Sequence, residues 1–310
     1  MDLPGYIRFH EGWYEVPGQL GAMLHSLGQY RPAGAGVRAD DERFLAKYGW
    51  TPFFLISELE VTLPGEFLHR PGEFPSVLYW AYNNELNKDI GLDLAPYLGR
   101  NVDVRLYKIA ELLPEFMKPR RECGRAVIVL SEGRVIGAWL DAGRHHAFAC
   151  SLSGRRFEDI TGKTWAGWVP GVIDADDAVE RELASLTPEE VIRRYYEAID
   201  RGDYPAALTC LTREHLLMYL FSNMDNRGLY NPGFDQGMLG LLNTTAARVE
   251  GVKKMEGTSV PEGCVMYQVV VDLTVEQPIT HGSGLQPRFV SLRRETPDTG
   301  WRIDGIGTGP

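Results

Sequence analysis

The most regular pattern of apolar and polar positions lies between residues 187 and 200. Apolar side chains recur there at the spacing of one helix face, with charged side chains between them: Val191, Ile192, Tyr195, Tyr196 and Ile199. Thr187 and Glu190 have the spacing of a capping box, and Pro188 suits a first helical turn. The pattern therefore predicts an amphipathic helix that starts after Thr187 and stops at Gly202.

The pattern changes after two shorter predicted helices, one that carries Leu208 and Leu211 and one that starts near Thr212. Strands are predicted over residues 246–254, 264–276, 287–295 and 300–305, separated by glycine and proline turns. In the second strand, alternation places one apolar set on a single face: Tyr267, Val269, Val271, Leu273 and Val275. Residues 185–310 are thus predicted to form an α+β domain with helices packed on a curved antiparallel sheet.

The N-terminal half gives a second, less regular pattern. Residues 1–37 are rich in glycine and proline and are predicted to be an irregular arm, with a short helix at most over 20–27. Residues 38–170 are predicted to form another α+β domain: helices near 40–48 and 78–86, and strands over 57–63, 102–106, 126–130, 135–139 and 147–152. Residues 171–184 are acidic and are predicted to be a solvated linker or helix.

Charge and cysteine content exclude several classes of function. The net charge is −10, and no basic run is longer than Arg120-Arg121, which argues against nucleic acid and against an anionic membrane surface. No apolar run reaches the roughly 20 residues of a membrane-spanning helix. The first residues lack the pattern of a signal peptide, so the chain as written is expected to be soluble and not exported. Four cysteines lie far apart and are expected to be buried, with no metal or other cofactor: Cys123, Cys150, Cys210 and Cys264.

The C-terminal half resembles a known superfamily. The segment TPEEVIRRYYEAIDRGDYPAALTCLT, followed by the strands and closed by GWRIDGIGTGP, resembles the NTF2-like (cystatin-like cone) superfamily over residues 185–310. This resemblance implies a lead helix that lies across the concave face of the sheet. The space between them is a pocket in some members and a filled core in others.

The N-terminal half has a resemblance of its own. The segments RFLAKYGW, YNNELNKDIGLDLAPYLGRNVDVRLYKI and GRVIGAWLD resemble an uncharacterised bacterial domain over about residues 41–168. Proteins with that domain are often extracytoplasmic or membrane-anchored and sometimes carry NTF2-like modules. The resemblance implies no activity, and it implies an extracytoplasmic location for a chain that once carried a leader.

If the predicted cone is open, ten residues are expected to line it: Tyr195, Tyr196, Ile199, Tyr219, Met224, Tyr267, Val269, Val271, Trp301 and Ile303. Tyrosines combine apolar area with a polar tip, which favours non-catalytic binding of a small amphipathic ligand or a peptide.

The first alternative is a filled cone that serves as an interaction scaffold, with a homodimer formed through the outer face of the sheet. The second follows from a resemblance to ketosteroid isomerase and scytalone dehydratase, in which an Asp or His base faces the cavity. Its candidate bases are His215, Asp225, Asp235 and Asp304, with no pair fixed by spacing. The adjacent His145 and His146 point to opposite faces of a strand and are not expected to bind one metal.

Overall fold

The computed structural model describes residues 5–9, 12–16, 30–118, 121, 124–142, 148–222, 243–256, 260–278 and 282–309. Helices are combined with antiparallel sheets, as predicted, so the chain belongs to the α+β class. The described residues form two compact units. Unit 1 contains the described residues of 5–66 and 80–162 together with 221–222, and unit 2 contains those of 67–79, 163–220 and 243–309. None of the described helices has both the length and the apolar composition to cross a membrane.

Three short strands form a small antiparallel sheet in the order β2-β1-β3 at the start of unit 1: β1 (Gly5–Phe9), β2 (Gly12–Val16) and β3 (Tyr30–Pro32). The sequence pattern predicted no regular structure here. The reason is that each strand is three to five residues long, too short for alternation to stand out from the glycine-rich background. The helix considered over residues 20–27 lies outside the described residues.

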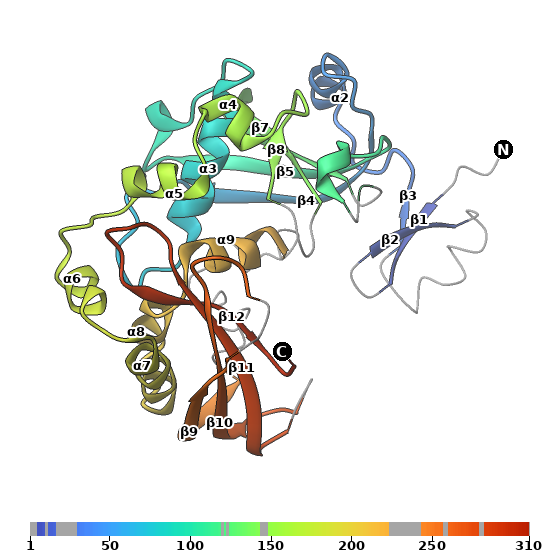
Figure 1. The fold of residues 1–310 in the computed structure, drawn as a ribbon. Coiled ribbons are helices and arrows are strands. Elements are labelled where there is room, and N and C mark those ends of the chain that lie inside the picture. Colours follow the sequence, from blue (N-terminus) through green and yellow to red (C-terminus); the bar gives the residue numbers. More distant parts are fainter. Residues whose placement is uncertain are drawn as a thin grey trace. The chain divides into compact units, whose positions relative to one another are not determined.

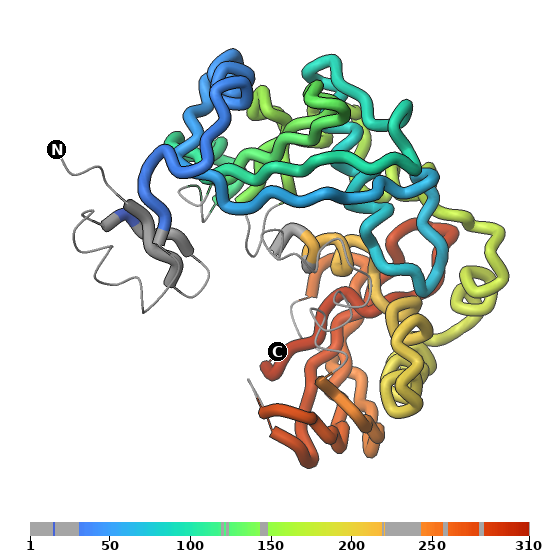
Figure 2. Tube along the Cα trace, turned by 180° about the vertical axis from the view of Figure 1, so that it is seen from behind, coloured from blue at the N-terminus to red at the C-terminus, as the bar shows by residue number. Residues whose placement is uncertain are grey.

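A five-stranded antiparallel sheet forms the centre of unit 1, in the order β4-β5-β6-β7-β8. Its strands are adjacent in sequence as well as in space, and the blue-to-green tubes of Figure 2 run side by side. The bounds are β4 (Pro52–Thr62), β5 (Asn101–Ile109), β6 (Arg125–Ser131), β7 (Arg134–Asp141) and β8 (Cys150–Ser151). The last strand is shorter than the predicted 147–152, of which residue 147 is not described.

The turn between β6 and β7 follows directly from its two residues. Glu132 and Gly133 both have a positive φ, of 50° and 75°, as a two-residue hairpin turn that matches the twist of its strands requires. Ser131 pairs with Arg134 on either side of the turn. Glycine adopts such a backbone without steric cost, which explains why Gly133 suits the second position of the turn.

Helices complete unit 1 and cover a largely apolar core. They are α2 (Ala39–Ala46), α3 (Ser76–Lys88), whose first four residues belong to unit 2, and α4 (Phe157–Thr161), with short 3-10 turns at Ala95–Tyr97 and Glu115–Met117. The ring of Trp80 on α3 meets Trp139 on β7 edge-on, with centroids 6.0 Å apart. Burial of large aromatic groups of this kind is a main source of folding free energy.

Unit 2 consists of short helices followed by a four-stranded antiparallel sheet (Figure 1). The helical part contains α5 (Trp165–Trp168), a 3-10 turn (Val169–Val172), α6 (Ala178–Ala184), α7 (Pro188–Asp200), α8 (Tyr204–Thr209) and α9 (Arg213–Ser222). The sheet has the order β12-β11-β10-β9, from β9 (Thr244–Lys254), β10 (Val265–Val275), β11 (Gly284–Arg294) and β12 (Trp301–Gly307).

Helix α7 packs against both edges of this sheet. It contacts β9 at one edge and β12 at the other, and its backbone comes less close to the two central strands. One apolar cluster joins the buried side of α7, the helix α8 and the inward positions of all four strands. The helix and the sheet therefore share a single core, which also reaches Leu211 and Leu216 at the start of α9.

Candidate functional site

The capping box at Thr187 fixes the start of α7 and so the direction of its tyrosines. The Thr187 N–H donates to Glu190 Oε2 at 2.7 Å, and the Glu190 N–H donates back to Thr187 Oγ1 at 3.3 Å. Tyr195 and Tyr196 lie on the buried side of the helix, with ring centroids 5.1 Å apart and planes at 76°. At the other end, Asp200 Oδ1 accepts a hydrogen bond from the Ala247 N–H of β9.

The structure brings most of the predicted site residues into one apolar cluster between α7 and the sheet. Its members among them are Tyr195, Tyr196, Ile199, Tyr267, Val269, Val271 and Ile303. Trp301 is half-buried and packs against the cluster. The guanidinium of Arg294 lies over its ring in a cation–π contact, 5.4 Å from the ring centroid. The Tyr219 side chain is not described, and Met224 lies outside the described residues.

Sequence reasoning missed one charged residue on the inward face of the sheet. Arg288 pairs directly with Val269 across the β10–β11 ladder, so the two side chains point to the same face. Gln286, two residues earlier, shares that face and accepts a hydrogen bond from Arg288 Nη2, while Nη1 donates to the Pro287 carbonyl at 3.0 Å. The alternation of residues 286–292 could have revealed this position. It places Arg288 on the same strand face as Val290 and Leu292, which are fully buried.

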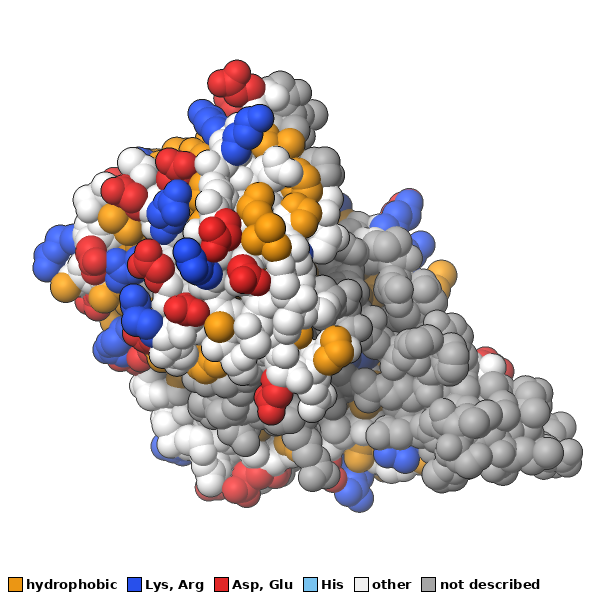
Figure 3. All heavy atoms as spheres, turned by 90° about the horizontal axis from the view of Figure 1, so that it is seen from below, with side chains coloured by type: hydrophobic (Ala, Val, Ile, Leu, Met, Phe, Trp, Pro, Cys, Tyr) orange, Lys and Arg blue, Asp and Glu red, His pale blue; other side chains and the backbone are white. Residues whose placement is uncertain are grey.

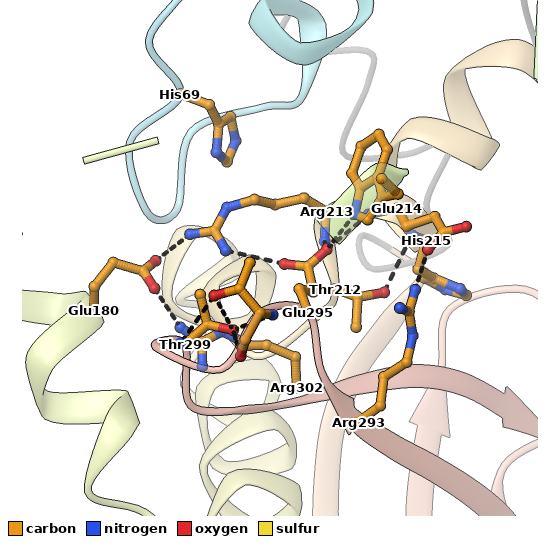
Figure 4. A network of polar contacts seen from close by, with 12 residues as sticks. His69, Glu180, Thr212, Arg213, Glu214, His215, Arg293, Glu295, Thr299 and Arg302 are labelled. Atoms are coloured by element: carbon orange, nitrogen blue, oxygen red, sulfur yellow. Dashed lines mark hydrogen bonds and ion pairs between the residues drawn. The ribbon is translucent and has the colours of Figure 1, made fainter. Parts of the chain in front are cut away.

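A second polar cluster in unit 2 consists of two arginines and two glutamates, which we call the charge network: Glu180, Arg213, Glu295 and Arg302 (Figure 4). Arg213 pairs with both glutamates, and Glu180 also pairs with Arg302 at 2.8 Å. All four side chains are at most 6% exposed. The charges balance, so the network satisfies the usual condition for burying ionised groups.

The charge network also holds the start of α9. Glu295 Oε1 accepts hydrogen bonds from the N–H groups of Arg213 and Glu214, at 2.7 and 3.1 Å, and from the Trp165 indole at 3.3 Å. A carboxylate at a helix N-terminus satisfies free N–H groups and matches the helix dipole. The network therefore connects α6, α9, β12 and the end of β11. Glu180 differs here from the expected solvated acidic stretch, because its side chain lies inside unit 2.

His69 lies beside the charge network (Figure 4) on a segment that precedes α3. Its Nε2 donates to the Glu73 carbonyl at 3.1 Å, which leaves Nδ1 as an acceptor. Burial, and next the positive charge of Arg213, lower the pKa of His69 to about 3. Neither His69 Nδ1 nor Arg213 Nε has a hydrogen-bond partner among the described residues. A neutral acceptor and a cationic donor thus lie in the same buried region.

The structure describes two of the four candidate bases and brings them together. Asp304 accepts from Thr212 Oγ1 at 3.0 Å and forms an ion pair with Arg293 at 2.8 Å. Burial lowers the pKa of His215, and the nearby Asp304 opposes this effect. Arg293 alternates with the inward-facing Leu292, so this group belongs to the opposite side of the strand from the α7 tyrosines. Asp225 and Asp235 lie outside the described residues.

A surface groove follows the solvent side of α7. It has a volume of about 540 Å³ and is lined mainly by charged side chains of α6, α7 and α8: Glu182, Glu190, Arg193, Arg194, Glu197, Arg201 and Asp203. Arg194 forms an ion pair with Glu182 here. Acidic and basic side chains are mixed on the face of the molecule seen in Figure 3, and the described surface in that view shows no large patch of one sign.

The described cysteines do not form a reactive or metal-binding group. Cys150 and Cys210 are buried and reduced, and burial raises the pKa of each thiol, that of Cys210 to about 11. Cys264 is half-buried, and Cys123 lies outside the described residues, as do His145 and His146. Within the described part of the chain, no three His, Cys, Asp or Glu side chains are arranged to hold a metal ion.

Comparisons with known proteins give two matches to domain families. Residues 44–140 match a domain of unknown function, DUF4830, and residues 189–307 match another, DUF4829. A search of curated proteins found no match. Among solved structures, a cystatin-like protein from Ruminococcus gnavus ATCC 29149 is similar to this chain, with 14% sequence identity and a TM-score of 0.28. The alignment covers 75% of this chain and 70% of that one.

Proposed function

We propose that residues 185–310 form an NTF2-like cone that binds a small amphipathic molecule without catalysing a reaction. In this proposal residues 38–170 are the other α+β domain along the sequence and residues 171–184 join the two, while residues 67–79 and the stretch from residue 163 pack into the unit that contains the cone. The ligand lies between α7 and the central strands β10 and β11. Two observations support the proposal: the sequence resemblance and the packing of α7.

The contact of α7 with both edge strands carries the proposal. Four strands span about 14 Å and a 13-residue helix is about 20 Å long, so on a flat sheet a helix that reached both edge strands would lie equally close to the strands between them. Helix α7 contacts β9 and β12 but approaches β10 and β11 less closely. This difference supports a sheet that curves around the helix. Such curvature puts the widest space over the central strands, where Tyr196 and Tyr267 contribute both apolar area and hydroxyl groups.

Two neighbouring valines on β10 provide a matched test. Val269 points inward and is fully buried, whereas Val270 points to the other face and is half-buried. We expect the full-length protein to bind the uncharged dye Nile red saturably, with one dye per chain. V269W fills the space and is expected to lower the affinity at least tenfold, whereas V270W is expected to bind as the wild type does. The measurement is dye fluorescence, with circular dichroism to verify folding.

Unsaturable dye binding to the wild type, or equal affinity in all three proteins, would contradict the proposal. If V269W does not fold, Y196A serves instead, because it enlarges the same space and is expected to change the affinity without adding volume.

The first alternative is a filled cone that acts as an interaction scaffold. Val269, Val271, Val290 and Ile303 are fully buried in one cluster, which favours a packed core at least around these positions. The outer face carries Leu285, which is 64% exposed, but a single exposed leucine is ordinary on a protein surface, so the homodimer through that face is carried by the sequence resemblance alone. Light scattering on the purified protein tests it, and a monomer at all concentrations counts against it.

An isomerase or dehydratase is the second alternative, and the described inward positions give it less support. It requires a carboxylate or imidazole beside a tyrosine in the ligand space. The described inward residues of β10 and β11 carry no such group, and Asp272 is exposed on the outer face of β10. His215 and Asp304 are associated with Arg293 instead.

A further inference from the structure

The buried arginines of the described chain differ in their partners. Four arginines are less than a tenth exposed: Arg125, Arg213, Arg288 and Arg302. Arg125 pairs with Asp141 at 2.6 Å, and Arg213 and Arg302 belong to the charge network. Arg288 is 7% exposed, and no described carboxylate lies within ion-pair distance of it. A buried charge costs several kcal/mol unless a counter-ion or hydrogen bonds compensate it, so among the described arginines this one is the exception that needs a reason.

The hydrogen bonds of the Arg288 guanidinium to described residues go to neutral groups. The acceptors are the Gln286 side chain and the Pro287 carbonyl, which are dipoles and not charges. A guanidinium has five N–H donors, so these two hydrogen bonds leave further N–H groups that can bind a ligand. Across the ladder its neighbour on the same face is Val269, in the apolar cluster under α7.

The Tyr196 hydroxyl is the second polar group in this region. Burial raises the pKa of Tyr196, and the positive charge of Arg288 acts in the opposite direction. The phenol is thus protonated at neutral pH and can donate a hydrogen bond. A cation and a neutral donor therefore come from opposite sides, one from the sheet and one from the helix.

We propose that Arg288 binds the carboxylate of an organic acid with an apolar body, and that Tyr196 donates a second hydrogen bond to that carboxylate. The proposal rests on the proposed function and specifies the class of its ligand. One guanidinium neutralises one negative charge, which fits a monoanion better than a phosphate dianion. The valines, Ile199 and the tyrosine rings around it provide apolar contacts for the rest of the molecule.

Octanoate and 1-octanol test the proposal, because they share an eight-carbon chain and differ in charge. Each displaces Nile red from the full-length protein at pH 7.5, and the fluorescence gives its affinity. We expect the wild type to bind octanoate at least tenfold more tightly than octanol. R288Q is expected to lose this preference and R288K to keep part of it. R248Q is the matched control on β9, because the Arg248 side chain is 80% exposed and pairs with Glu250.

The outcomes separate this inference from the proposed function. If Nile red binds but octanoate and octanol bind equally, or if R288Q keeps the preference, Arg288 is not the anchor and the binding cone still stands. If neither the dye nor either compound binds, both proposals fail. Should R288Q not fold, R288M is the second variant. It is expected to have an unchanged or higher Tm without ligand, because it removes a buried charge that no described carboxylate neutralises, and to bind both compounds equally.

Discussion

Individual residues show that burial, and not residue type, decides what a charge does in this protein. Glu180 and Glu182 lie two positions apart on α6, and both pair with arginines. Glu180 is inside the charge network, whereas the Glu182 side chain is 56% exposed. Water screens the second pair and not the first, so the same chemical group has different energetic weight at the two positions.

This contrast predicts unequal effects of one substitution. E180Q leaves the buried Arg302 without its carboxylate and Arg213 with only Glu295, so we expect a loss of about 3–5 kcal/mol in the free energy of unfolding. E182Q is the control and is expected to unfold like the wild type. Urea denaturation of the two variants measures the difference, and equal midpoints would show that the network does not stabilise unit 2.

His69 predicts a dependence of stability on pH. Its folded pKa of about 3 lies below the ordinary 6.5, so the unfolded chain binds a proton first as the pH falls. Its contribution is complete above pH 6.5 and decreases progressively down to pH 3. Between pH 7.5 and pH 5.0 we expect the wild type to lose about 2 kcal/mol more than H69Q, because the glutamine at position 69 does not titrate and all other groups are the same in both proteins. Urea unfolding at both values measures this, and parallel losses would contradict it.

Most residue-scale features could not be predicted from the sequence. Arg288 occupies a predicted strand, but its face depends on the register with β10, which alternation in one strand does not fix. Glu180 lies in an acidic stretch, and its burial depends on Arg213 and Arg302, which are 33 and 122 residues away. The tyrosines of α7 were predictable, because a helix with a capped start orients them from local sequence alone.

The elements themselves followed from local sequence where the pattern was long. Helix α7 was predicted from Thr187 onward and is observed over Pro188–Asp200, and the strands of unit 2 agree within three residues at each end. The small sheet β2-β1-β3 was missed, because very short strands depend on pairing with each other. The α+β class is confirmed, and the cone remains a prediction.

The capping box makes a prediction at the scale of one helix. T187A removes the acceptor for the Glu190 N–H and the Thr187 Oγ1 contact with Glu190. We expect a loss of about 1 kcal/mol in the free energy of unfolding. T187S keeps the hydroxyl and is expected to match the wild type. Thermal unfolding followed by circular dichroism compares the three proteins, and a T187A as stable as T187S would mean that the cap contributes nothing.

At the scale of the whole chain, the two units are not consecutive in sequence. Residues 67–79 leave unit 1 after β4 and belong to unit 2, where the His69 N–H donates to the Val172 carbonyl at 2.8 Å. The backbone of Gly72, with φ of 80°, approaches the Pro205 carbonyl so closely that a Cβ would lie 3.0 Å from its oxygen. The DUF4830 match over residues 44–140 includes this segment, so a region assigned to one family contributes to the unit that carries the other.

Replacement of residues 67–75 by nine glycine and serine residues tests this assignment. The variant loses the His69 contacts beside the charge network, so we expect faster amide hydrogen exchange in α6 and α9 and unchanged exchange in β6 and β7. Exchange followed by mass spectrometry on the full-length protein measures each peptide. Uniform acceleration, or none in α6 and α9, would show that the segment is not part of unit 2.

Residues 67–79 belong to unit 2 although unit 1 continues after them, and this has a consequence for inheritance. A recombination breakpoint anywhere between codons 80 and 162 puts the His69 segment in one gene product and its Val172 acceptor in another. Neither protein product then contains the whole of unit 2, although each family match occupies a continuous stretch of the gene. Selection is therefore expected to transmit the two regions together and in this order, and gene fragments designed for expression need to respect the same linkage.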